Sequence, residues 1–248
     1  MTLVVPPTEG PIWISLLSDD PEERRNVLLM LKEGYQRSVD DDFDLSKLAQ
    51  YHPGTMVLVG RRKVVGQDTM VIVGTVALQW AADFDTFGRF LGGCGPKLLQ
   101  YGVRFAPPAL VATRACTLVK RTYLSWRAPI IELAIVRGVR SQAGLNLVVS
   151  KIPRRLRKLG YDTYRMTDRD CPTAPLKGRK AVTIVHRSRF ETVLRLLEEL
   201  RLKPASEDGG FPRHEWAAGS ARVTYNLWLE GGSQWWLNPP VTGSGGEG

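Results

Sequence analysis

The stretch that decides the expected fold runs from Ile130 to Tyr164 and reads IIELAIVRGVRSQAGLNLVVSKIPRRLRKLGYDTY. Its first part, 129–136, is an apolar run rich in Ile and Val, which predicts a strand. Apolar residues three or four apart over 145–159 predict one face of a helix, and Gly160 is a good helix stop. Residues 161–166 predict another strand. The order strand, turn, helix, strand predicts a right-handed crossover between neighbouring strands.

The turn at 137–144 is basic and contains glycine, which makes it a candidate anion site. The first backbone N–H groups of a helix have no partners inside the helix, and the helix dipole adds positive potential there. A glycine lets a ligand approach the backbone closely, and Arg137 and Arg140 add charge. A phosphate or pyrophosphate suits such a site. The alternative is an ordinary turn, because any crossover needs one.

The strand, turn and helix together resemble the acyl-CoA pyrophosphate loop of the GNAT superfamily of N-acyltransferases, whose pattern is Gln/Arg-x-x-Gly-x-Gly/Ala. Aligned on Gly144, residues 141–146 read SQAGLN, so Ser141 stands where Gln or Arg is usual and Asn146 where Gly or Ala is usual. The run VIVGTVAL, 71–78, resembles the family's preceding strand. The resemblance covers about residues 12–170.

The resemblance implies an α/β (α+β) fold with a mixed, mostly antiparallel central sheet flanked by helices. An insertion is expected at about 83–113, where aromatics and glycines interrupt the pattern, and a C-terminal β-α-β extension from about 171. We expect a single domain over 12–230, with flexible tails at 1–11 and 242–248. The insertion would shape the acceptor pocket, or it would be a structural excursion or a subunit contact.

The activity implied by the resemblance is transfer of an acetyl or similar acyl group from coenzyme A to an amine acceptor, so the expected cofactor is acetyl-CoA or another acyl-CoA. Backbone groups of the 129–136 run would pair with the pantetheine arm, and the turn with the diphosphate. The expected cofactor-binding residues are Leu133, Ile135, Val136, Gly138, Val139, Arg140, Ser141, Gln142, Ala143, Gly144, Leu145 and Asn146.

Two catalytic residues are expected, Glu132 and Tyr164. Burial of Glu132 in its apolar run would raise its pKa toward the range of a general base, unless it pairs with an arginine or faces a polar layer. The family often presents a tyrosine as general acid on a helix after the last strand of the crossover, and residues 165–185 contain no tyrosine. The acid role is then either unassigned or passed to Tyr161, Tyr164 or Cys171, and Tyr164 is the candidate that we carry forward.

A net charge of +9 and a pI near 9.7 point to a polyanionic partner, either a phosphate-bearing cofactor or nucleic acid. Arg154, Arg155 and Lys158 share the polar side of the predicted central helix and could contact phosphates. The alternative function is therefore nucleic-acid-directed: a nucleobase-modifying GNAT relative, or a binding module that has lost the cofactor. A basic surface that only aids solubility remains open.

The cysteines and histidines give no metal or disulfide pattern. Cys94, Cys116 and Cys171 are far apart and odd in number, which predicts free thiols in a cytoplasmic protein. The three histidines are scattered, so we expect no metal. No apolar run is of membrane-spanning length and the N-terminus lacks signal-peptide features, so no membrane partner is expected and a cytoplasmic location is the default.

The remaining elements follow from local patterns. Asp20 as N-cap and Pro21 at the first position predict a helix over about 21–37. Other expected strands are 13–17, 55–59, 69–80, 115–126, 181–185 and 222–229, and other expected helices are 45–51 and 190–202.

Overall fold

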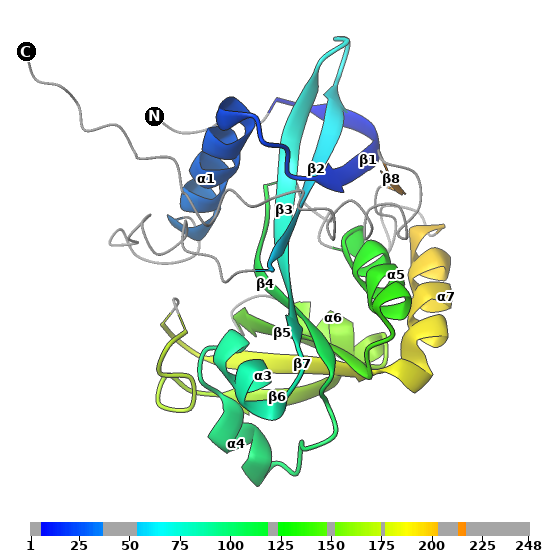
Figure 1. Cartoon of the computed structure of the whole chain (residues 1–248). Helices are drawn as coiled ribbons and strands as arrows, with labels where there is room; N and C mark the ends of the chain where they lie inside the picture. The colour runs from blue at the N-terminus through cyan, green and yellow to red at the C-terminus, as the bar shows by residue number, and fades with distance from the viewer. Residues whose placement is uncertain are drawn as a thin grey trace, which may run out of the picture.

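The computed structural model describes residues 6–36, 54–118, 124–147, 152–174, 177–202 and 213–216, and its centre is one eight-stranded sheet (Figure 1). The strand order is β6-β7-β5-β4-β3-β2-β1-β8. Only the neighbours β4–β5 and β1–β8 are parallel, and all other neighbours are antiparallel. The expected mixed, mostly antiparallel sheet is therefore confirmed.

The strands are β1 (Thr8–Leu16), β2 (Met56–Val64), β3 (Met70–Ala81), β4 (Ala109–Thr117), β5 (Ser141–Leu147), β6 (Asp162–Met166), β7 (Lys180–His186) and β8 (His214–Trp216). The helices are α1 (Pro21–Gln36), α3 (Phe84–Phe90), α4 (Gly95–Gln100), α5 (Arg127–Arg137), α6 (Ile152–Lys158) and α7 (Phe190–Arg201), with a short 3-10 turn, η2 (Arg187–Arg189), before α7. None of the helices in the described ranges is long and apolar enough to cross a bilayer.

Helices cover both faces of the sheet, because alternate residues of each strand face opposite sides. On one face, Leu110 and Ala112 of β4 join a core cluster with residues of α5, α6 and α7. On the other face, Ala109 and Val111 join a cluster with α3 and α4. A separate cluster on that second face packs α1 against β2 and β3 through residues such as Val57.

The deciding stretch folds differently from the expectation. The predicted strand 129–136 is part of helix α5. Four of its apolar residues, Ile130, Ile131, Leu133 and Ala134, are buried, as one face of a helix would be. Gly138 (φ 70°) is its left-handed C-cap, so the glycine ends a helix and not a strand. A short apolar run fits a buried helix as well as a buried strand, and here the packing of α5 on the sheet decides.

The predicted helix over 145–159 is also wrong. Residues 141–147 form β5, which is bonded to β4 on one side and to β7 on the other. Helix α6 begins only at Ile152, and Pro153 lies in its first turn, where proline costs no intrahelical bond. The strand of the expected crossover, β6, is confirmed, but its neighbour is β7 and not the 129–136 run.

Most of the other local predictions hold. The helix expected over 21–37 is α1, the predicted hairpin is β2 and β3, and the later strand and helix are β7 and α7. The strand expected at 115–126 is shifted, because β4 spans Ala109–Thr117. The expected 83–113 insertion contains α3, α4 and the start of β4. The predicted helix 45–51 and strand 222–229 lie outside the described residues.

The prediction of three free thiols is wrong. Cys94, at the start of α4, forms a disulfide with Cys171, in the loop after β6, and their Cα atoms are 4.6 Å apart. The disulfide fastens the inserted helices to that loop, and Gly92 packs so closely on Ala174 that a Cβ would lie 2.7 Å from it. Cys116 keeps its thiol. The two bonded cysteines are 77 residues apart, so only the tertiary structure brings them together.

Candidate functional site

The middle of the sheet contains a place where two parallel neighbours part. The β4–β5 ladder runs from Ala109↔Ser141 to Ala112↔Gly144 and ends there. Beyond it, β4 stays paired with β3 as far as Thr117, and β5 stays paired with β7 to its end. The two strands therefore diverge toward their C-terminal ends, and we call this place the β4–β5 split.

A β-bulge in β4 lies at the split. Between the pairs Ala77↔Thr113 and Thr75↔Cys116, β3 advances by two residues and β4 by three. Arg114 lies within this bulge. Its φ of 48° is in the left-handed region, which costs a non-glycine residue about 1–2 kcal/mol. A bulge bends and twists its strand, which gives a local reason for β4 to leave β5 at this point.

The last rung before the split is tight. A Cβ on Gly144 would lie 3.3 Å from the carbonyl oxygen of Ala112. Two residues further along β5, the Asn146 side chain donates from Nδ2 to Thr183 Oγ1 at 2.9 Å. Glycine at 144 thus keeps side-chain bulk out of the apex, and the arm of β5 past the apex is held against β7.

Helix α5, the next described helix after β4, starts at an anchored tryptophan. Trp126 is 5% exposed, and its indole lies across Gly60 and Gly74, which face each other on β2 and β3. A Cβ would lie 2.6 Å from Trp126 Cζ2 at Gly60 and 2.9 Å from it at Gly74. The start of α5 is therefore fixed on the sheet, close in sequence to the end of β4, although residues 119–123 between them lie outside the described part.

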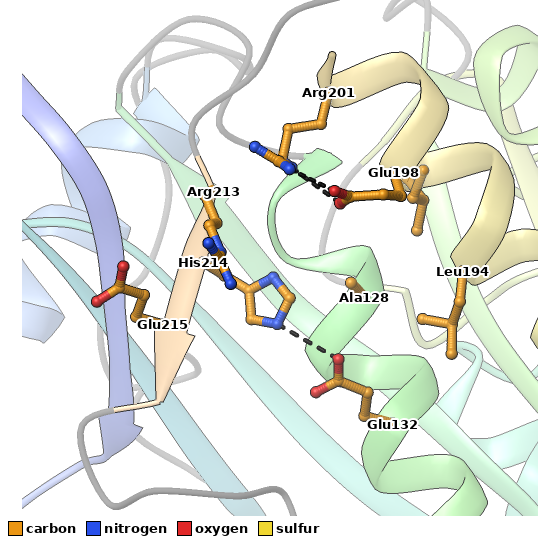
Figure 2. Close-up of a pocket in the computed structure, with 9 residues that line it drawn as sticks. Ala128, Glu132, Leu194, Glu198, Arg201, Arg213, His214 and Glu215 are labelled. Atoms are coloured by element: carbon orange, nitrogen blue, oxygen red, sulfur yellow. Dashed lines mark hydrogen bonds and ion pairs between the residues drawn. The ribbon is translucent and has the colours of Figure 1, made fainter.

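A pocket of about 570 Å³ lies elsewhere, between α5, α7 and β8 (Figure 2). Glu132 Oε1 on α5 faces His214 Nε2 on β8 at 3.4 Å, and Arg201 on α7 binds the Glu198 carboxylate, with Nε to Oε2 at 2.8 Å. That hydrogen bond from Arg201 lowers the pKa of Glu198. The lining residues are Ala128, Glu132, Leu194, Leu197, Glu198, Arg201, Arg213, His214 and Glu215.

Several solved structures match the chain in a structural comparison at low sequence identity. FeeM, an N-acyl amino acid synthase from uncultured soil microbes, superposes with a TM-score of 0.50 at 10% identity, over 76% of this chain and 99% of its own. A CoA-dependent acyl-homoserine lactone synthase, BjaI, gives 0.44 at 11% identity, over 89% and 100%. A polyamine N-acetyltransferase from Drosophila melanogaster gives 0.45 at 13%, over 70% and 99%.

The chain has a GNAT-like fold. No protein-family model matches the sequence, and no curated protein matches it. The GNAT resemblance seen in the sequence is thus confirmed at the level of the fold. The residues first aligned with the family's pyrophosphate loop, however, are not in a loop.

The predicted cofactor residues are divided by this GNAT-like fold among three elements. Leu133, Ile135 and Val136 lie on α5, and Gly138 to Arg140 end that helix and lead into β5. Residues 141–146 are in β5, which is paired with β4 as far as Gly144 and with β7 throughout. The helix start expected over 138–146 is therefore wrong, because residues 141–147 are a strand, paired with β4 as far as Gly144 and with β7 to its end. Only Gly144, Leu145 and Asn146 reach the β4–β5 split.

Glu132 lies on the side of α5 that faces away from the sheet. Its neighbours Ile131 and Leu133 are 0% and 1% exposed, whereas the Glu132 side chain is 32% exposed. A helix places position 132 opposite 130 and 134, which are both buried. The strand beside a cofactor, on which its role as a base depended, is absent, and Glu132 instead faces the pocket. No local pattern predicted its partner His214, because the two residues are 82 positions apart in the chain.

The three candidates for the general acid are divided between the two faces of the sheet, with Tyr164 and Cys171 on one face and Tyr161 on the other. Tyr164 packs with the inserted helices, with its ring centroid 5.5 Å from that of Tyr101, and burial is the main cause that raises its pKa. Cys171 is in the disulfide and has no proton to give. Tyr161 is fully buried beside the α5 cluster, and burial raises its pKa to about 12. Its hydroxyl has no hydrogen-bond partner among the described residues.

No group of three or more metal-ligating side chains comes together within the described ranges. The described part of the chain therefore offers its chemistry in two places, a parting of strands and a charged pocket. The first is a backbone feature and the second is made of side chains.

Proposed function

We propose that the protein is an N-acyltransferase that moves an acyl group from coenzyme A to an amine. The observation that carries the proposal is the β4–β5 split in a GNAT-like fold. Paired strands lie about 4.8 Å apart, so an extended arm with amide groups can pair with a strand only where its neighbour has moved away. The pantetheine arm of coenzyme A is such a chain, and the split supplies the space.

The residues around the split fit this group. Residues 113–117 of β4 would face the arm, and Gly144 at the apex leaves room for it. The diphosphate would face the start of α5, where the first N–H groups of the helix have no intrahelical partner and the dipole is positive. Trp126 would hold that helix start in place through its contact with Gly60 and Gly74.

The reaction needs no covalent bond to a protein side chain. Coenzyme A supplies the acyl group as a thioester. The amine nitrogen attacks the thioester carbonyl, the C–N bond forms as the C–S bond breaks, the thiolate leaves, and the amine loses a proton. No protein nucleophile takes part, so the chain's contribution is to position the donor and to exclude water. Because FeeM is an N-acyl amino acid synthase, amino acids are the first acceptor class to test.

Calorimetry with acyl-CoA thioesters of increasing chain length tests the donor. We expect a dissociation constant in the micromolar range for at least one of them. Gly144→Val should weaken binding about tenfold or more, because its side chain presses on the Ala112 carbonyl at the apex. Thr163→Val is the matched control: it adds no bulk, removes a hydroxyl without a described partner, and lies on β6.

Two results would overturn the proposal. One is a folded parent protein that binds no acyl-CoA at millimolar concentration. The other is Gly144→Val binding as tightly as the parent, which would place the donor away from the split. Thiol release with a panel of amino acids and amines then identifies the acceptor.

The nucleic-acid alternative rests on the net charge of +9 and on basic residues such as Arg154, Arg155 and Lys158, and it stays a prediction. A gel shift with duplex DNA and with tRNA over a range of salt tests it, because phosphate contacts make affinity fall steeply with salt.

A further inference from the structure

The pocket between α5, α7 and β8 is separate from the β4–β5 split. Ala128 and Glu132, which line it, project from the outer side of α5, while Ile131 and Leu133 on the inner side are buried against the sheet. Helix α5 thus stands between the pocket and the middle of the sheet. A volume of about 570 Å³ lies within the range of small-molecule sites.

The floor of this pocket is apolar. Ala128 contributes a small side chain from α5, and Leu194 lies opposite on α7 (Figure 2). Leu197, also on α7, is a further lining residue. Leu197 is 2% exposed and belongs to the main core cluster, so this part of the floor is held by core packing. A short hydrocarbon chain can lie on such a floor and remove apolar surface from water.

The pocket lining holds more carboxylates than guanidinium groups. Glu132 points into the space beside His214, and with Glu198 and Glu215 the lining holds three carboxylates against two guanidiniums. With neutral histidine the lining therefore carries an excess of one negative charge, although the whole chain carries +9. A carboxylate at the edge of an apolar floor is a site for an ammonium group, which donates charge-assisted hydrogen bonds.

The second charged group that the pocket offers to a ligand is the guanidinium of Arg213. Arg201 already gives two donors to Glu198, which occupies its fork. Arg213 lies across the pocket from α7 in Figure 2 and forms no ion pair with any described carboxylate, while its backbone carbonyl accepts from Ile12 N at 2.7 Å. The β-bridge to β1 fixes the backbone, so the guanidinium is presented from a held strand and suits a carboxylate.

We propose that this pocket binds a small zwitterion, a molecule with an ammonium group and a carboxylate joined by a short apolar chain. The ammonium lies at Glu132, the carboxylate at Arg213, and the chain rests on Ala128, Leu194 and Leu197. The pocket and the proposed acyl-donor site meet at the first turn of α5, where Ala128 lies, but the zwitterion would lie on the outer side of that helix, so we expect ligand and acyl-CoA to be held at the same time.

Three probes with the same carbon chain separate the two charged ends. Calorimetry of the full-length protein, without acyl-CoA, compares 6-aminohexanoate with hexylamine and with hexanoate. We expect one-to-one binding of the zwitterion, about tenfold tighter than either singly charged probe, because each end adds a charge-assisted contact. Glu132→Gln should weaken 6-aminohexanoate and hexylamine about tenfold and leave hexanoate unchanged. Arg213→Gln should weaken 6-aminohexanoate and hexanoate instead.

Glu199→Gln is the matched control. This substitution also removes one negative charge, here from α7. Glu199 pairs with Arg195 on the exposed surface and does not line the pocket. It should bind all three probes as the parent does. Thermal melting of each variant checks that the fold is kept.

Absence of binding for all three probes at millimolar concentration overturns the proposal, as does an unchanged affinity for 6-aminohexanoate in Glu132→Gln. Competition between the zwitterion and acyl-CoA would overturn the separation of the two sites. Because the probe titrations contain no acyl-CoA, their outcome is independent of the proposed acyl transfer. A protein that binds acyl-CoA but no probe fails only this inference.

Discussion

Gly60→Ala is the sharpest test of how the sheet holds the start of α5. The added Cβ would lie 2.6 and 2.8 Å from Trp126 Cζ2 and Cη2, and 2.8 Å from Ile12 Cγ2. Real Cβ atoms do not approach other atoms so closely. Both neighbours are buried, since Trp126 is 5% exposed and Ile12 is 0% exposed. The ring or the strand must shift, and overpacking of this kind costs about 1–3 kcal/mol.

The assay is equilibrium unfolding in urea together with thermal melting. A loss of about 2 kcal/mol in a chain of this length lowers the melting temperature by about 4–8 °C. On a Trp126→Phe background, the outer indole atoms that the methyl meets are gone. Gly60→Ala should then cost at least about 1 kcal/mol less, and this coupling energy measures the contact itself.

The same variant connects packing to the proposed function. If the contact with Gly60 holds the start of α5 beside the β4–β5 split, Gly60→Ala should also weaken acyl-CoA binding. A Gly60→Ala protein that melts within about 1 °C of the parent, or shows no coupling to Trp126→Phe, would refute the reasoning.

Three further outcomes are expected. Under denaturing conditions the protein should show one reactive thiol before reduction and three after, and reduction of Cys94–Cys171 should destabilise it by about 4.5 kcal/mol, from the entropy of a loop of this length. Lys180, which is 1% exposed, binds the Asp168 carboxylate, and its hydrogen bond lowers the pKa of Asp168. Parent stability should therefore exceed that of Asp168→Asn at neutral pH, and the difference should shrink as pH falls below about 4, where the carboxylate is protonated. Burial raises the pKa of Tyr161 to about 12, so absorbance titration should show one tyrosine that ionises last, and this step should be missing in Tyr161→Phe. Stability linked to Tyr161 should fall as pH rises above about 10, because the unfolded chain releases that proton first.

The sequence by itself determined the elements whose signals are local. Asp20 and Pro21 predicted the start of α1, and alternating and apolar runs on either side of a polar turn predicted the β2–β3 hairpin. The apolar positions of α7 follow the helical period, so that helix was also predicted closely. The resemblance to the GNAT superfamily gave the right fold class from flanking strands and spacing, even though the residues aligned to the loop were misplaced.

The secondary structure of residues 130–164 and the positions of both candidate sites were decided only by the tertiary structure. Residues 129–136 can be a buried strand or a buried helix, and nothing local chooses; the sheet face that α5 covers makes the choice. Residues 141–147 become a strand because β4 and β7 offer hydrogen-bond partners on both sides, and those partners lie more than 20 residues away in each direction, as for Ala112 and Thr183 with Gly144. The β4–β5 split and the pocket around Glu132 are likewise relations between distant segments. Periodicity indicates which face of an element is buried, but not which other element covers that face. The packing of those elements determines where the β4–β5 split and the pocket lie.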